Sequence, residues 1–346
     1  MDLSIAGILL LDGSSNGAIY ALLALAIVLV FAVTRVILVP QGEFATYGAL
    51  TLAMLQLGRV PGTVWLLLAL ALGVSALDGV DALRHRRSAA RVASAFLQPL
   101  AVPLPVVLIS LWAAAQQMPL MLQSLLTLAI VTPLGPLLYR VAYEKVADAS
   151  VLVLLIVSVG VHFAMTGLGL GFFGAEGFRA PSFWDTDFRF GAVLLSGQAV
   201  IIFMVSIALM VGLWLFFERT LRGKALRATA VNRLGARLMG ISTVGAGRLS
   251  FTLAAFIGAL AGLLIAPTTT MAYDTGFLIG LKGFVAAIFG GLASYPGAAL
   301  GALFVGLLES FGSFWASSFK EVIVFTLILP VLLWRSFKHG PDEEEE

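Results

Sequence analysis

Few ionisable side chains lie within the apolar stretches of this sequence, so few residues could do chemistry inside them. The candidates are Glu43, His162 and Glu309, with Lys282 and Arg35 near the ends of such stretches. An ionisable group is costly to bury in an apolar helix and therefore suggests a function, such as proton transfer. The structural alternatives are a neutral His162 bonded to a neighbouring carbonyl and a Glu309 that faces water or caps a helix. Three scattered groups make a poor proton relay, so the energy source is expected outside this chain.

Metal and nucleotide chemistry find no support in the sequence. The chain has no cysteine, and its three histidines lie far apart, which argues against a metal site. No G-x-x-x-x-G-K-[ST] phosphate loop is present, because the Gly223-Lys224 pair is followed by Ala225. We therefore expect no metal, no bound cofactor and no enzymatic activity in this chain.

Composition indicates a membrane protein. Of the 346 residues, 60% are hydrophobic and 12% are charged, and the mean hydropathy is +1.01. Soluble domains carry about 25% charged residues, and apolar runs of about 20 residues are typical of transmembrane helices. The sequence thus predicts an all-α polytopic membrane protein. The net charge of +2 does not indicate nucleic-acid binding, because basic residues in a membrane protein mainly reflect how its loops are oriented across the membrane. The N-terminus lacks a basic region before its first apolar residues, so we expect no cleaved signal.

Apolar runs define the predicted spans. They lie near residues 14–34, 42–57, 62–80, 94–115, 118–139, 150–173, 197–217, 249–271, within 281–312, and near 320–335. Residues 1–11 could add a short apolar helix against the bundle. The expected total is about 8–11 transmembrane helices.

Basic residues indicate the orientation of these spans. They gather at 84–91, 140–145 and 218–248, and near the end at 335–338. Basic loops favour the cytoplasmic side. With all four groups inside, the N-terminus lies outside and the C-terminus lies in the cytoplasm. Residues 94–139 then form a hairpin, and residues 150–217 form two spans joined outside.

The segment 281–310 is expected to contain an interrupted helix. Its two halves hold about 11–16 residues each, whereas a full crossing needs roughly 20. Between them stand Gly290, Gly291, Pro296 and Gly297, which break a helix. Irregular backbone at membrane depth is tolerated only where it is buried in protein or lines a cavity. We therefore predict a broken or re-entrant Gly-rich pair that borders a binding or permeation site, together with Gly42.

The segment 223–241, "GKALRATAVNRLGARLMGI", is too polar to span a membrane. Small residues recur in it at three- and four-residue spacing, which predicts one short helix with a small, weakly apolar stripe. Orientation places this helix in the cytoplasm. Physics alone leaves two interpretations open, a basic loop that contacts anionic lipid and a helix that docks into a groove of another protein.

Three stretches carry motifs of a known family. Residues 16–50 contain Tyr20 and a G-[DE]-F…G-A element that begins at Gly42-Glu43, and residues 281–310 match an L-K-x-F-x-A-x-x-x-G-G…G-A block. Residues 218–241 meet a third pattern at Gly223, Ala225, Arg227, Ala228, Ala230, Asn232, Ala236, Gly240 and Ile241. Together these stretches resemble the permease subunits of ABC importers for branched-chain amino acids, the LivH type.

The resemblance implies a function for each stretch. The 218–248 loop would be the coupling loop that contacts an ATP-hydrolysing subunit. The expected coupling residues are Gly223, Ala225, Arg227, Ala228, Asn232, Ala236, Gly240 and Ile241, and the expected substrate path comprises Tyr20, Gln41, Gly42, Glu43, His162, Gly290, Gly291, Pro296 and Gly297.

The resemblance also implies partners and a place in the cell. Expected partners are a second, different permease chain, two ATP-binding subunits that use ATP, and a periplasmic or extracellular solute-binding protein. The expected location is the bacterial inner membrane. The competing hypotheses are an importer for urea, amides or aromatic acids on the same scaffold, and a stand-alone secondary transporter or channel.

Two departures from the family pattern stand out. Family members usually read I-N-F-A-H-G-[DE] where this chain reads Ile37-Leu38-Val39-Pro40-Gln41-Gly42-Glu43, which suggests a less polar path. Residues 79–116 are longer than the usual connection and are expected to add a span or a peripheral helix. We expect one permease domain over residues 1–340 and a disordered acidic tail at 341–346.

Overall fold

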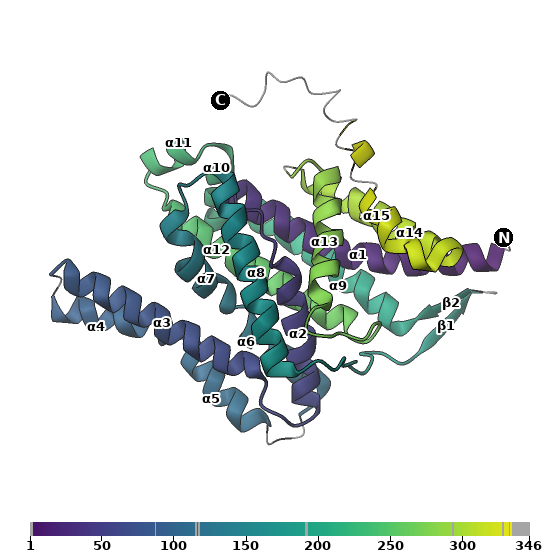
Figure 1. The fold of residues 1–346 in the computed structure, drawn as a ribbon, viewed down its shortest axis with the longest axis horizontal. Coiled ribbons are helices and arrows are strands. Elements are labelled where there is room, and N and C mark those ends of the chain that lie inside the picture. Colours follow the sequence, from purple (N-terminus) through teal and green to yellow (C-terminus); the bar gives the residue numbers. More distant parts are fainter. Residues whose placement is uncertain are drawn as a thin grey trace.

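The computed structural model describes residues 3–333, apart from residues 87, 115, 117, 191–192, 293, 327–328 and 332 (Figure 1). The longer helices are α1 (Leu3–Thr34), α2 (Gln41–Gln56), α3 (Gly62–Arg84), α5 (Pro103–Ala114), α6 (Leu120–Val131), α8 (Val151–Phe173), α9 (Gly197–Arg219), α10 (Leu221–Val231), α12 (Thr243–Ile265), α13 (Thr275–Phe289) and α14 (Tyr295–Ala316). Shorter elements are α4 (Ala89–Leu97), η1 (Gln98–Leu100), α7 (Leu134–Leu138), the π-helix η2 (Tyr139–Tyr143), η3 (Glu144–Val146), the strands β1 (Asp187–Phe190) and β2 (Val193–Ser196), α11 (Arg233–Leu238), η4 (Ser317–Phe319) and α15 (Lys320–Thr326).

The predicted all-α polytopic membrane fold is confirmed. The described part of the chain contains eight helices that are long and apolar enough to cross a membrane, which lies within the predicted range. Two further apolar helices, α2 with 16 residues and α13 with 15, are shorter. Helices suit this setting because they satisfy every backbone hydrogen bond within the segment, and hydrocarbon offers no water to replace those bonds.

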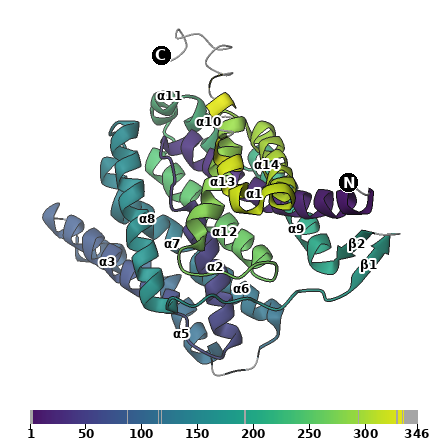
Figure 2. The same ribbon diagram turned by 45° about the vertical axis from the view of Figure 1, so that its right-hand side comes forward.

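Close packing of small residues builds the centre of the bundle. Every residue of α2 from Gln41 to Leu55 is buried, and the helix lies between α8, α12 and α13 (Figure 2). A side chain at Gly262 of α12 would overlap the backbone of Ala45, and one at Gly48 of α2 would lie 2.6 Å from the carbonyl oxygen of Ala259. The absence of side chains at these glycines lets the two helices approach closely, as in other membrane bundles.

The N-terminal helix corrects one expectation. Residues 1–11 and 14–34 were predicted as two helices, but α1 runs without interruption from Leu3 to Thr34. Gly13 and Gly17 of this helix lie against Leu307 and Leu303 of α14. The helix continues because a break inside an apolar bundle would leave backbone groups without partners.

The predicted broken pair is present, but its second arm is longer than expected. Helix α13 ends at Phe289 and α14 begins at Tyr295, so the interruption falls at the predicted Gly290 and Gly291, whereas Pro296 and Gly297 lie in the first turn of α14. Gly291 and Leu292 adopt positive φ angles of 73° and 58°, which turn the chain sharply. Helix α14 has 22 residues rather than 11–16, so at 1.5 Å per residue it is long enough to cross a membrane.

Three other segments refine the predictions. The 174–196 connection holds a hairpin of β1 and β2, and an isolated bridge joins Phe178 to Met271. Helices α4 and α5 form a peripheral span over Ala89–Ala114, within the long 79–116 segment. Only 11% of its apolar 18-residue window is buried. The last predicted span begins with α15, while Arg335, Lys338 and the acidic tail lie outside the described residues.

Candidate functional site

A buried pair of one histidine and one glutamate lies at the start of α2. The Nδ1 atom of His162 on α8 is 2.7 Å from Oε1 of Glu43, and the Glu43 side chain is fully buried. The ring of Phe277 from α13 stacks on the imidazole with centroids 4.8 Å apart. The predicted alternative for His162, a hydrogen bond to a backbone carbonyl, is therefore wrong, because its partner is the carboxylate of Glu43.

Glycines let α13 approach this site. A side chain at Gly42 would overlap the backbone of Gly276 and would lie 2.9 Å from the amide nitrogen of Gly280. Gly276 in turn faces the hydroxyl of Thr46. The start of α2 therefore touches α13 backbone to backbone, and any movement of α13 changes the surroundings of Glu43.

Several acceptor oxygens at this site lack partners. The Nε2 atom of Gln41 donates to the carbonyl oxygen of Ala254 at 3.1 Å. Oε1 of Gln41, Oε2 of Glu43 and Oγ1 of Thr46 are buried without a hydrogen-bond partner in the described structure. Leaving a buried acceptor unpaired costs about 1–3 kcal/mol. These three oxygens therefore offer hydrogen-bonding capacity to a ligand with N–H groups.

The predicted substrate-path residues do not form a single cluster. Gln41, Gly42, Glu43 and His162 come together at the start of α2, as described above. Gly290, Gly291, Pro296 and Gly297 lie instead at the far end of α13, where Gly290 packs on Gly297. Tyr295 beside them stacks on Phe217 at the end of α9, with centroids 5.7 Å apart. The interrupted backbone thus borders the loop that carries the predicted coupling residues.

Tyr20 belongs to a third group, a buried network of charges. Nζ of Lys282 on α13 lies 2.6 Å from Oε1 of Glu309 on α14 and 3.1 Å from Oε1 of Glu321 on α15. The hydroxyl of Tyr20 on α1 donates to the other oxygen of Glu309 at 2.5 Å. Only 6% of the Lys282 side chain and 11% of the Glu309 side chain are exposed. The alternative that Glu309 faces water is wrong.

Sequence reasoning placed Lys282 near the end of a span and missed this network. The available signal was one basic and one acidic residue on the two arms of the predicted broken pair. Opposite charges on neighbouring membrane helices usually pair, because an isolated charge there is costly.

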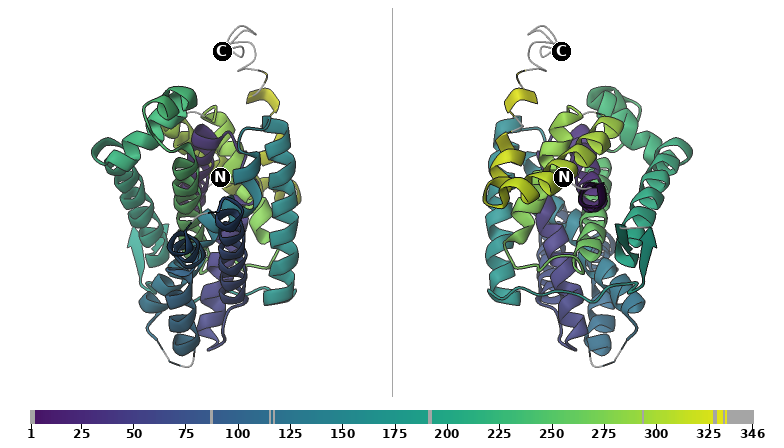
Figure 3. Two further views of the ribbon diagram at one scale, coloured as in Figure 1. Left: turned by 90° about the vertical axis from the view of Figure 1, so that its left-hand side faces the viewer. Right: turned by 90° about the vertical axis from the view of Figure 1, so that its right-hand side faces the viewer.

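The predicted coupling segment forms two helices rather than one. Thr220 caps α10 by accepting a hydrogen bond from the amide of Gly223 at 3.0 Å. Asn232 ends that helix and caps α11 through the amide of Gly235 at 2.7 Å. A side chain that caps a helix stabilises its start, so Asn232 sets the break between α10 and α11. Both helices stand at one end of the bundle (Figures 1 and 3).

The outer surface of α10 and α11 carries a shallow groove of about 490 Å³. Its lining includes five of the predicted coupling residues, namely Arg227, Ala228, Asn232, Ala236 and Ile241. Two others have structural roles: Gly223 packs against the backbone of Phe216 and Phe217, and Gly240, with φ of 80°, ends α11.

Large apolar side chains project around this groove. Leu221, Val231, Leu238 and Met239 are between 81% and 86% exposed, and Leu234 is 68% exposed. Such an apolar patch on a polar loop marks an interaction surface. The loop is also tied to the bundle, since Arg237 pairs with Asp148 at 2.9 Å and Arg233 donates to the carbonyl oxygen of Ala147 at 2.9 Å.

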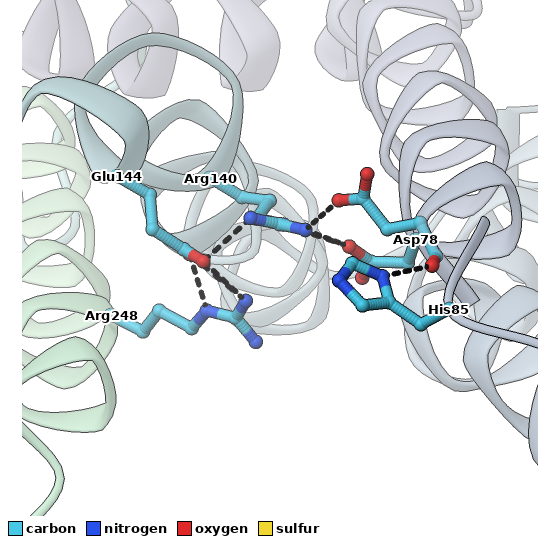
Figure 4. Close-up of polar contacts among 6 residues, drawn as sticks. Asp78, His85, Arg140, Glu144 and Arg248 are labelled. Atoms are coloured by element: carbon cyan, nitrogen blue, oxygen red, sulfur yellow. Dashed lines mark hydrogen bonds and ion pairs between the residues drawn. The ribbon is translucent and has the colours of Figure 1, made fainter. Parts of the chain in front are cut away.

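Next to this loop, a chain of ion pairs connects α3, η2 and α12 (Figure 4). The guanidinium of Arg140 contacts Asp78 of α3 and lies 2.6 Å from Oε1 of Glu144. Nε of Arg248, in the second turn of α12, donates to Glu144 at 3.0 Å, and Asp81 adds a longer contact to Arg140 at 3.3 Å. Arg140 lies in a π-helix, a local irregularity that often marks a functional site. This network links α3 to the base of α12, directly after α11.

The model of a protein family described as "Branched-chain amino acid transport system / permease component" matches residues 92–332, well over half of the chain. The chain belongs to this permease family. The match includes the coupling segment, the broken pair and, of the buried charge network, Lys282, Glu309 and Glu321. The predicted family is thereby confirmed, and the protein is a multi-pass membrane protein of the permease type.

Curated relatives agree with this assignment. The high-affinity branched-chain amino acid transport system permease protein BraD of Pseudomonas aeruginosa is 31% identical over 220 residues, covering 60% of this chain and 70% of the relative. LivH of Escherichia coli is 31% identical over 214 residues, covering 60% and 69%. The probable LivH of Methanocaldococcus jannaschii is 27% identical over 199 residues, covering 54% and 63%. A solved structure of PsaBC from Streptococcus pneumoniae with Fab aligns over 96% of this permease and 92% of that chain, with 13% identity and a TM-score of 0.38, too distant to support an argument.

Proposed function

We propose that this chain is the transmembrane subunit of an ATP-driven importer for branched-chain amino acids or related small solutes. The family assignment and the names of the curated relatives support the solute class. In this proposal the chain works in the bacterial inner membrane with a second permease, two ATP-binding subunits and an external solute-binding protein. The N-terminus lies outside and the basic loops lie in the cytoplasm.

The observation that carries the proposal is the exposed groove on α10 and α11. Its lining combines small residues, such as Ala228 and Ala236, with the exposed side chains of Val231 and Met239. A membrane helix surface cannot cover this patch, because the segment is too polar to enter the bilayer. A soluble subunit that inserts a complementary surface would bury these apolar groups, and burial stabilises by about 25 cal/mol per Å².

Movement of this loop would reach the transmembrane helices by two routes. One runs directly into α9 and α12, which continue α10 and α11 along the chain. The other runs through Asp148, which pairs with Arg237, and then through Glu144 and Arg140 to α3. Rigid helices tied by ion pairs transmit displacements between discrete arrangements.

The solute path in this proposal passes the start of α2. Glu43 and Gln41 each present an unpaired acceptor oxygen there, which suits the ammonium group of an amino acid. Apolar neighbours such as Phe277 suit an aliphatic side chain. The path would open when α13 separates from Gly42.

Substitution of Ala228 tests the coupling surface. Gly223 is a poorer choice, because its packing on Phe216 means that a larger residue would disturb the loop itself. In proteoliposomes that hold the complete transporter, Ala228→Trp should reduce ATP-dependent uptake of labelled leucine at least tenfold while the chain still inserts. The matched control Ala228→Ser keeps the residue small and should transport normally. Normal uptake by Ala228→Trp would rule out this groove as the coupling surface.

Substitution of Glu43 tests the path separately. Glu43→Gln removes the charge but keeps the shape, and the loss of a charge-assisted contact should lower uptake by about tenfold. The control is Thr51→Val, further along α2, which removes the 2.8 Å contact of Thr51 with Thr63 on α3. Both variants should still bind the ATP-binding subunits. Unchanged uptake by Glu43→Gln would exclude this residue from the path.

A further inference from the structure

A large apolar cleft lies where α1, α9 and α10 meet the turn between α13 and α14. Its volume is about 830 Å³, and its walls include Leu29, Trp214, Phe217, Leu226 and Tyr295. This volume lies near the upper end of the roughly 300–1,000 Å³ range of small-molecule sites. A single branched amino acid would fill only part of it. The cleft therefore fits a larger apolar ligand.

The surroundings of α9 indicate where that ligand comes from. Only 11% of the most apolar window of α9 is buried, so the described residues leave its outer face uncovered. Ile207, Val211 and Trp214 on this helix are 60%, 49% and 58% exposed. Since Trp214 also lines the cleft, the exposed face of α9 and the cleft are continuous. An acyl chain can enter from the bilayer without crossing a polar barrier.

Positive charge gathers at the polar edge of the cleft. Arg35 follows the last turn of α1 with φ of 61°, and its amide donates to the carbonyl oxygen of Phe31 at 2.8 Å. Its side chain is exposed and forms no ion pair within the described residues. Arg227 also lines the cleft but pairs with Glu218 at 2.8 Å, so the charge of Arg35 stays uncompensated.

We propose that this cleft binds one anionic phospholipid. The phosphate contacts Arg35, and an acyl chain lies along Leu29, Trp214 and Phe217 between α1 and α9. Basic pockets between membrane helices at a membrane surface are suited to anionic headgroups. The lipid would hold α10 at a fixed distance from α1 and so would set the resting position of the coupling segment. This proposal concerns lipid binding by the chain itself and stands whether or not ATP drives transport.

Native mass spectrometry of the purified full-length chain tests the proposal. The probes are phosphatidylglycerol and phosphatidylcholine with identical acyl chains, titrated into detergent micelles. We expect one phosphatidylglycerol to bind at least about tenfold more tightly than phosphatidylcholine, the effect of one charge-assisted contact. Arg35→Gln should abolish this preference. Arg59→Gln, at an exposed arginine outside the cleft, should keep it.

A second pair of variants separates the lipid from other occupants. Ala32→Trp fills the cleft and should weaken binding of both lipids, which tests the apolar walls without changing charge. Because the chain has no cysteine, Met210→Cys places a single thiol at the cleft. A disulfide between two copies of this variant in native membranes would assign the cleft to a second copy and overturn the proposal. Equal affinity for both lipids, or an unchanged preference in Arg35→Gln, would overturn it as well.

Discussion

Replacement of Lys282 by methionine should strongly destabilise the bundle. Methionine has a similar length and is apolar, so the packing around residue 282 is preserved while the charge is lost. The Glu309 carboxylate, 11% exposed, would keep the Tyr20 hydroxyl as its remaining described partner. Removal of one partner of a buried ion pair costs about 3–5 kcal/mol, because the other charge stays buried without compensation. We expect Lys282→Met to lower the free energy of unfolding by that amount.

The double variant Lys282→Met/Glu309→Gln tests whether the loss of stability comes from the unpaired charge of Glu309. It removes the charges of Lys282 and Glu309 and leaves that of Glu321, whose side chain is 33% exposed. The hydroxyl of Tyr20 can still donate to the new amide oxygen. Replacement of a whole buried pair by neutral groups is often nearly neutral. We therefore expect the double variant to be more stable than Lys282→Met alone, by about 2 kcal/mol or more.

Equilibrium unfolding in mixed micelles of increasing SDS content, followed by tryptophan fluorescence, measures these differences. Lys145→Met is the control, because Lys145 is exposed and has no ion pair among the described residues, and it should stay within about 0.5 kcal/mol of the parent. If Lys282→Met also stays within 1 kcal/mol, or if the double variant is no better than the single one, the network does not stabilise the fold as argued.

Three further predictions concern the same unfolding measurement. Gly262→Ala should destabilise the protein by about 1–3 kcal/mol, because a side chain there overlaps Ala45, whereas Gly160→Ala, with open space around it, should match the parent. Arg140→Leu should lower the free energy of unfolding by about 2–3 kcal/mol, because it leaves partly buried carboxylates without their cationic partner. A decrease below about 0.5 kcal/mol would show that the network in Figure 4 adds little to stability. Tyr47→Phe should cost about 1 kcal/mol, since it removes the 2.6 Å hydrogen bond to the carbonyl oxygen of Met165; equal stability would contradict that contact.

The transmembrane helices were predictable because apolar runs of about 20 residues rarely occur outside membrane-spanning helices. The break at Gly290 and Gly291 was predictable for a similar reason, since consecutive glycines followed by Pro296 rarely continue a helix. The uninterrupted α1 was not predicted, because the packing of Gly13 against Leu307 joins positions far apart in the sequence. Local patterns report propensity, whereas close helix contacts come from tertiary packing.

The candidate site was predicted residue by residue but not as an arrangement. Glu43 and His162 were both identified as unusual, yet their pairing joins positions 119 residues apart, which no local pattern reveals. The split of the coupling segment had a readable signal, since Asn232 followed by Gly235 three residues later suits a helix cap. One continuous helix was nevertheless predicted, because the small residues at three- and four-residue spacing fit one helix equally well.

Uptake of labelled leucine into vesicles tests the central claim most directly. The chain is reconstituted with its second permease and the solute-binding protein, with and without the ATP-binding subunits. We predict that uptake requires both those subunits and ATP, and that a proton or sodium gradient cannot replace them. Gradient-driven uptake by this chain without the ATP-binding subunits would contradict the account and would identify a secondary transporter.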